Sequence, residues 1–230
     1  MIRRIAVNVT KKIGLYNPIV KHATKLINRR KRTHFKKHGL EALIQADKAF
    51  RSVNSKIFLV HGTLLGAYRD KNFIPYDFDI DVGFCVEEEP ENVIDLMRSF
   101  GFKPVKLYTL KGTNTVTEYV FSYKGVQIDF FAYFKKDNDM FSYSGRPHET
   151  KHWTDANKTD GFPCVQISVP LSDFSEYDFL NHRFFIPDKT PEWLEDIYGK
   201  SYMTPIKNWD EKDHKTRIVL SSKRVYRTYF

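Results

Sequence analysis

Three aspartates alternate with apolar residues in the run Asp77-Phe78-Asp79-Ile80-Asp81. This alternation is typical of a β-strand, so the three carboxylates are predicted on one face, about 6.6 Å apart along the strand. Two unit charges about 4 Å apart repel by about 4 kcal/mol at an effective dielectric constant near 20. Such a cluster is tolerated when one member is protonated or when cations bind it. Because Mg²⁺ prefers oxygen ligands and often binds substrate phosphates as well, the run indicates a metal site.

A glycine turn lies shortly before the acidic run. Residues 57–60 are apolar and typical of a buried strand, Gly62 interrupts them, and residues 63–68 are predicted to form a short helix. Free backbone N–H groups at the start of a helix bind phosphate, so Gly62 and Thr63 are predicted to hold a phosphate group. A phosphate-binding turn close to a metal-binding strand indicates phosphoryl transfer.

The same residues resemble a known family. Residues 61–66 (HGTLLG), then Arg69 and residues 73–81 (FIPYDFDID), resemble the LicD/fukutin family of phosphotransferases, and more distantly the DNA polymerase β-like nucleotidyltransferases. Residues 127–131 (QIDFF) look like the strand that carries the family's last acidic residue, and residues 191–199 (PEWLEDIYG) like its C-terminal segment. The expected fold is therefore α+β, a nucleotidyltransferase-like mixed β-sheet flanked by helices, with an N-terminal basic helix.

The resemblance assigns roles to particular side chains. It implies that Asp79, Asp81 and Asp129 hold one or two Mg²⁺ or Mn²⁺ ions. Asp129 or Asp77 would accept the proton of the acceptor hydroxyl. Two further residues are expected to bind or orient the substrate: Arg69 could pair with a phosphate or with one of the carboxylates, and His61 either orients the glycine turn or is a buried structural histidine.

The activity implied by the resemblance is transfer of an alcohol phosphate, such as phosphocholine or ribitol phosphate. The donor would be a CDP-alcohol, and the acceptor a hydroxyl of a cell-surface glycan or glycolipid. A nucleotidyltransferase that moves a nucleoside monophosphate is the main alternative. A non-catalytic glycan- or nucleotide-binding protein is a third reading, which the intact set of three aspartates disfavours, because uncompensated buried charges are costly.

The charge of the chain is concentrated at its beginning. The formal net charge is +9, but residues 1–40 carry twelve Lys or Arg and no acidic residue, so the remainder is slightly acidic. This disfavours nucleic acid as a partner, because a polyanion needs a basic surface across the body. We expect residues 1–38 to form a basic amphipathic helical segment and residues 39–230 the catalytic domain. Residues 18–37 would bind an anionic membrane surface, or else pack on the domain with a solvated basic edge.

Composition sets broader limits. With 41% hydrophobic residues the chain can form one sizeable core. It contains neither an apolar run of the about 18 residues that span a bilayer nor the apolar region of a signal peptide. We therefore expect a cytoplasmic protein, either free or peripheral on the inner face of the membrane. Cys85 and Cys164 are predicted to be small core residues.

The remaining periodicity predicts further elements. Helices are expected at residues 17–37, 39–53 and 90–100 and from Thr190 onwards, and strands at 105–110, 115–123, 126–134 and 162–169. A long polar loop is expected at residues 137–161, where Arg146, His148, Lys151 and His152 could form an anion-binding lid. The C-terminal residues give no clear pattern.

Overall fold

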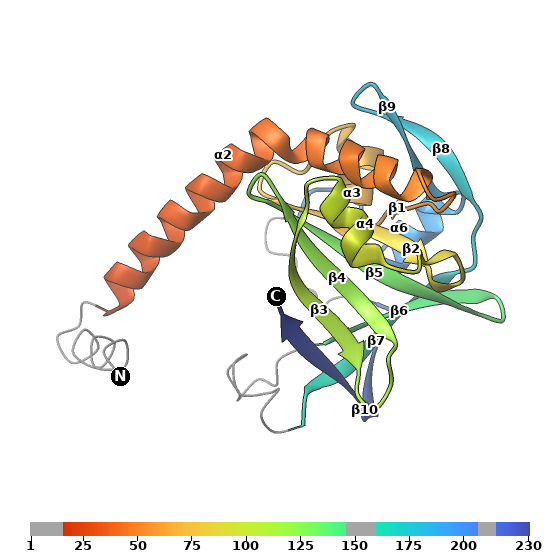
Figure 1. Cartoon of the computed structure of the whole chain (residues 1–230). Helices are drawn as coiled ribbons and strands as arrows, with labels where there is room; N and C mark the ends of the chain where they lie inside the picture. Colours follow the sequence, from red (N-terminus) through yellow and green to blue (C-terminus); the bar gives the residue numbers. More distant parts are fainter. Residues whose placement is uncertain (1–15, 146–159, 207–214) are drawn as a thin grey trace.

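The computed structural model describes residues 16–145, 160–206 and 215–230, with the side chains of residues 16–27 outside the description. The described residues form a mixed sheet with helices packed against it (Figure 1). Its helices are α2 (Tyr16–Arg51), α3 (His61–Leu65), the π-helix η1 (Gly66–Asp70), the 3-10 helix η2 (Val86–Glu88), α4 (Val93–Ser99) and α6 (Thr190–Tyr198). Its strands are β1 (Phe58–Leu59), β2 (Asp79–Cys85), β3 (Lys103–Leu110), β4 (Val116–Tyr123), β5 (Val126–Lys136), β6 (Asp139–Gly145), β7 (Phe162–Pro170), β8 (Phe174–Phe179), β9 (His182–Pro187) and β10 (Arg217–Tyr229). The expectation of an α+β fold is confirmed at this level.

Strand β5 organises the sheet. The strand order is β4-β3-β10-β7-β6-β5-β2-β1-β9-β8, with β4 also paired to β5. Strand β2 runs parallel to β5 along one edge, from Asp79 to Cys85. The opposite edge of β5 is shared, because β4 pairs with residues 126–131 and β6 with residues 133–136. Strands β3, β4, β5, β6, β7 and β10 therefore close into a ring.

Strand β10 completes this ring from the C-terminal end of the chain. It lies between β3 and β7, antiparallel to both. Sequence analysis did not predict it, because its charged residues mask the alternation that marks a strand. The hairpin of β8 and β9 and strand β6 were missed as well, and β6 occupies the start of the predicted loop 137–161. The predicted lid residues Arg146, His148, Lys151 and His152 lie outside the described residues.

Helix α2 covers one face of the sheet with its C-terminal half. The predicted helices 17–37 and 39–53 are wrong as separate elements, because the helix runs unbroken from Tyr16 to Arg51. Glycine in a helix costs about 1 kcal/mol relative to alanine, but Gly39 sits against the ring of Phe35, and the buried face that follows it packs on the sheet. Packing therefore carries the helix through the glycine. The division into residues 1–38 and 39–230 stays a prediction.

Aromatic side chains fill the interface of α2 with the sheet and that of α6 with the sheet. Phe50 of α2 stacks on Phe130 of β5 with 5.5 Å between ring centroids. Trp193 of α6 is fully buried and stacks on Tyr133 at 5.3 Å, as expected for a core residue. Cys85 and Cys164 are also buried, which confirms their prediction.

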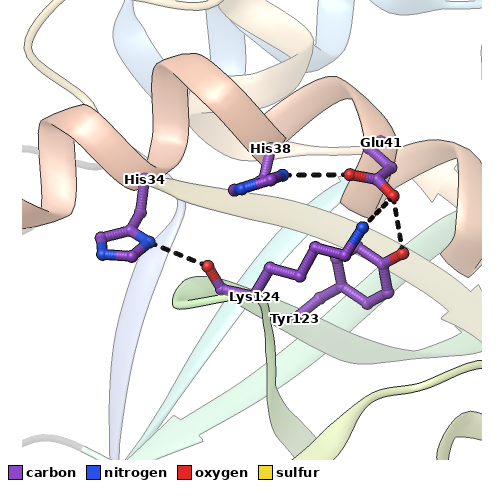
Figure 2. A network of polar contacts seen from close by, with 5 residues as sticks. All are labelled: His34, His38, Glu41, Tyr123 and Lys124. Carbon is purple, nitrogen blue, oxygen red and sulfur yellow. Dashed lines mark hydrogen bonds and ion pairs between the residues drawn. The ribbon is translucent and has the colours of Figure 1, made fainter.

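A polar clamp fixes α2 where it leaves the body (Figure 2). Glu41 accepts hydrogen bonds from the Tyr123 hydroxyl at 2.9 Å and from the Lys124 ammonium, and it pairs with His38 at 3.0 Å. These contacts, that of Lys124 first, lower the pKa of Glu41 to about 2. His34 Nδ1 lies 3.0 Å from the Lys124 carbonyl oxygen. The clamp joins α2 to the hairpin turn between β4 and β5, and beyond it the N-terminal half of α2 projects from the body (Figure 1).

Candidate functional site

A cavity of about 560 Å³ opens at the acidic edge of β2 and β5 and extends into the ring. The carboxylates of β2 and β5 form one wall. The inward-facing residues of β3, β4, β6 and β7 form the inner end. We call the other part of the lining the outer end. It consists of residues of α3, η1 and α6, of the loop residues Ile74 and Tyr76, and of the segment 202–206. The cavity therefore joins the predicted acidic site to a ring interior that sequence analysis did not foresee.

The acidic residues are brought together by strand register. Asp81 of β2 stands directly beside Asp129 of β5, and Asp79 stands beside Gln127. The two acidic strands are therefore neighbours in the sheet. All four predicted carboxylates, including that of Asp77, line the cavity. The sequence interpretation was wrong about the strand itself, because β2 begins only at Asp79 and Asp77 lies in the preceding loop, beyond the β-pairing.

Gly62 brings the loop against the strand. A Cβ atom on this residue would lie 2.4 Å from Asp77 Oδ2 and 3.4 Å from Asp81 Oδ2, so the glycine leaves room for the Asp77 carboxylate in its present position. The Gly62 N–H donates a hydrogen bond to Asp81 Oδ2 at 3.2 Å. In the structure this N–H therefore binds a carboxylate. To serve the predicted phosphate site, it would have to donate to a phosphate oxygen instead of Asp81.

Thr63 has a different position from the one predicted. Helix α3 starts at His61, so Thr63 lies inside it rather than at its cap. The hydroxyl is buried and accepts a hydrogen bond from the Asp81 N–H at 2.9 Å. Thr63 is not among the residues that line the cavity, and its visible contact holds α3 against β2.

His61 and Arg69 both line the cavity. His61 adopts a left-handed backbone with φ +45°, a strained conformation for a residue with a side chain. Its ring meets Phe131 of β5 edge-on at 4.8 Å. Arg69 donates two hydrogen bonds of 2.8 Å to Asp70. It therefore pairs with the adjacent residue and not with Asp77, Asp79, Asp81 or Asp129. A third contact, 3.3 Å to the Tyr202 carbonyl oxygen, fixes its guanidinium at the outer end.

The carboxylates repel one another within a poorly solvated pocket. Burial, reinforced by Asp79, raises the pKa of Asp77 to about 8 and that of Asp129 to about 7. Burial and the three neighbouring carboxylates raise the pKa of Asp81 well above its ordinary value. Gln127 Nε2 donates to both oxygens of Asp129, at 3.1 and 2.9 Å, and partly offsets this effect. Burial and mutual repulsion thus favour the protonated form of Asp77, Asp81 and Asp129 in the absence of a bound cation.

The donor set fits a hard divalent cation in its chemistry, since it consists of carboxylate oxygens. Among the described residues, none of these four aspartates forms an ion pair with a basic side chain. No group of three or more His, Cys, Asp or Glu within the same residues has the geometry to hold a metal ion as it stands. The carboxylates would therefore have to rotate toward a common point in order to bind one.

The inner end of the cavity contains residues that sequence analysis did not select. They are Lys106 and Tyr108 of β3, Glu118 of β4, and Ser142 and Ser144 of β6. The strands that carry Lys106, Tyr108 and Glu118 were predicted from the sequence, but β6 and the ring that brings these residues to the acidic site were not. Tyr198 of α6, within the segment that resembles the family's C-terminal motif, also lines the cavity.

The fold and the cavity define an α+β domain with an acidic ligand pocket, and comparisons with known proteins place it further. A family model described as LicD/FKTN/FKRP, nucleotidyltransferase domain, matches residues 54–187. The chain therefore belongs to the LicD/FKTN/FKRP family, as the motifs predicted. The match begins just before β1 and ends with β9, so it includes Gly62 and all four aspartates.

Individual relatives agree with the family match. Ribitol-5-phosphate transferase FKTN of Macaca fascicularis and that of Homo sapiens are each 25% identical over 181 residues, which cover 77% of this chain and 36% of theirs. An uncharacterized protein of Rickettsia typhi, RT0683, is 29% identical over 144 residues, 61% of this chain and 41% of that protein. The chain spans little more than a third of the length of the FKTN relatives. The family and these relatives suggest a phosphotransferase.

Proposed function

We propose that the chain transfers an alcohol phosphate from a CDP-alcohol donor to a hydroxyl group of a glycan or glycolipid. The observation that carries the proposal is the register of Asp81 beside Asp129 in one cavity with Asp79 and Asp77. Family membership supports the reaction class, and the printed activity of the FKTN relatives supports an alcohol phosphate as the transferred group.

Asp79, Asp81 and Asp129 would hold Mg²⁺ or Mn²⁺. When bound, such a cation stabilises the negative charge of the transferring phosphoryl group and of the leaving group. Gln127 orients the Asp129 carboxylate through two hydrogen bonds, which leaves the remaining lone pairs of both oxygens for a ligand. Arg69, fixed by Asp70, would present its cationic edge to the donor at the outer end of the cavity.

The acceptor hydroxyl would attack the phosphorus that bears the alcohol, and the bond from this phosphorus to the oxygen of CMP would break. Asp77 is the proposed general base. It lies in the loop rather than in the strand, and it lacks the Gln127 contact that occupies Asp129. Asp77 also lines the cavity, against Gly62, where its carboxylate could meet an acceptor hydroxyl.

Product analysis tests this reaction against the alternatives. The purified chain is incubated with Mg²⁺, an acceptor glycan and CDP-ribitol or CDP-choline, and the acceptor is weighed by mass spectrometry. A gain of alcohol phosphate with release of CMP supports the proposal. A gain of a nucleoside monophosphate would instead identify a nucleotidyltransferase. Donor binding without turnover would indicate the non-catalytic reading.

A membrane partner is proposed for the projecting part of α2. Arg29, Arg30, Lys31 and Arg32 are exposed there, and Lys36 and Lys37 are exposed where the helix meets the body. Each basic residue near an anionic surface contributes about 1 kcal/mol to binding. The described residues contain no helix that is long and apolar enough to cross a membrane. Cosedimentation should show binding to vesicles with phosphatidylserine, weakened by salt and by charge reversal at residues 29–32. Equal binding to neutral vesicles would contradict an electrostatic contact.

A further inference from the structure

One row of side chains crosses four strands of the cavity. Lys106 of β3 stands beside Val120 of β4, Val120 stands beside Asp129 of β5, and Asp129 stands beside Asp81 of β2. Neighbouring strands are about 4.8 Å apart, so the backbones of Lys106 and Asp129 are separated by about 10 Å. The register therefore places a cation opposite the acidic pair, with the apolar Val120 between them.

The local backbone supports the orientation of Lys106. The pairing of β3 with β4 shifts register between Pro104 and Lys106. A β-bulge of this kind re-aims the side chain that follows it. Lys106 lines the cavity, and among the described residues it forms no hydrogen bond or ion pair. The positive charge of Lys106 still acts on Asp129. Burial raises the pKa of Asp129, and the charge of Lys106 offsets part of this increase.

The ring interior beyond Lys106 is lined with hydrogen-bonding groups. The Ser144 hydroxyl oxygen is buried and has no hydrogen-bond partner within the described part of the chain. Ser142 of the same strand, Tyr108 and Glu118 line the same end. A buried hydroxyl without a partner carries a desolvation cost, which a ligand with its own hydroxyl groups would remove.

We propose that Lys106 binds the phosphate of the transferred group, and that the ring interior receives an alcohol with several hydroxyl groups. This inference rests on the proposed alcohol-phosphate transfer and deepens it. The phosphate would lie between the Lys106 ammonium and the acidic pair. A quaternary ammonium alcohol would bring a second positive charge close to Lys106 and would leave the Ser144 hydroxyl unpaired. The nucleotide would occupy the outer end, where the exposed Tyr76 offers a ring for the base.

Binding measurements separate this subsite from turnover. The full chain is titrated calorimetrically, in Mg²⁺ buffer, with ribitol 5-phosphate, phosphocholine and CMP. The variants are Lys106→Met, Lys106→Arg and, as a matched control on the same strand, the exposed Lys103→Met. Lys106→Met should weaken binding of ribitol 5-phosphate about tenfold or more, the usual effect of losing a charged hydrogen bond. CMP binding should not change. Lys106→Arg should retain most of the affinity, and Lys103→Met all of it.

Several results would overturn the subsite. These are equal losses of CMP and ribitol 5-phosphate binding in Lys106→Met, no loss of either, no binding of ribitol 5-phosphate by the wild type, or phosphocholine binding as tight as that of ribitol 5-phosphate. Thermal unfolding of each variant shows whether it is folded, and Ser144→Ala provides a second variant that should weaken ribitol 5-phosphate alone. If ribitol 5-phosphate binds as expected while no CDP-alcohol is turned over, the proposed reaction fails and the subsite stands.

Discussion

The buried carboxylates make residue-scale predictions possible without a substrate. Replacing Asp81 by Asn removes a buried carboxyl group whose charged form the cavity disfavours, and it keeps an acceptor for the Gly62 N–H. In metal-free buffer we expect Asp81→Asn to raise the free energy of unfolding by about 1 to 3 kcal/mol, because it relieves charge repulsion and desolvation. The same variant should lose turnover. Chemical denaturation measures the first effect.

The exposed Asp178 provides the control for that measurement. Its side chain is 89% exposed, so Asp178→Asn should change stability by less than about 0.5 kcal/mol. A loss of stability in Asp81→Asn would mean that a group of the folded chain stabilises the ionised Asp81 carboxylate, which would contradict its raised pKa. Normal turnover of Asp81→Asn would show that Asp81 does not belong to the proposed site.

The dependence of stability on pH tests the environment of Asp77. Its pKa is raised from 3.8 to about 8 in the folded chain, so the folded state holds a proton that the unfolded state releases. Stability must therefore fall as pH rises between these values and level off above them. Asp77→Asn lacks this titration. In EDTA the melting temperature of the variant should exceed that of the wild type by an amount that grows from pH 5 to pH 8. Added Mg²⁺ should reduce this difference in melting temperature. A constant difference across this range would contradict the burial of Asp77.

At the scale of elements, the clamp between α2 and the β4–β5 turn can be tested with two glycines. Gly125 has φ +84°, and a Cβ atom there would lie 2.9 Å from His34 Nδ1. Gly112 has φ +76° and nothing within 4 Å of its Cβ position. Both alanine variants carry the cost of a left-handed residue, about 1 kcal/mol. Gly125→Ala should cost more than Gly112→Ala in thermal unfolding, and His34→Ala should remove the excess. Equal losses of stability in the two alanine variants would show that α2 does not pack against this turn.

Local patterns predicted the elements near the site better than the elements that enclose it. Alternation identified β4 and β5 and placed Asp129 on a strand beside the acidic one. It also extended β2 two residues too far, because alternation in Asp77 and Phe78 continues where strand pairing does not. The helix after the first strand was predicted, but it begins two residues earlier than expected, at His61, through a left-handed backbone that no residue pattern encodes.

At the scale of the whole molecule, the ring is what joins the acidic edge to Lys106 and Ser144. It closes through β10, whose residues are separated in sequence from those of β3 by about half of the chain. Such non-local pairing leaves no periodic signal, which is why the inner end of the cavity was not predicted. The family motifs, in contrast, lie within contiguous segments, so the sequence alone predicts which aspartates share the cavity.

The central claim is that the aspartates of β2 and β5 together bind a divalent cation beside a nucleotide diphosphate. Anomalous diffraction from crystals soaked with Mn²⁺ and CDP tests it most directly. We predict an Mn²⁺ peak within coordination distance, about 2.2 Å, of oxygens of Asp79, Asp81 and Asp129, and in contact with the diphosphate. A peak elsewhere, or a nucleotide bound with these three carboxylates turned apart, would contradict the account.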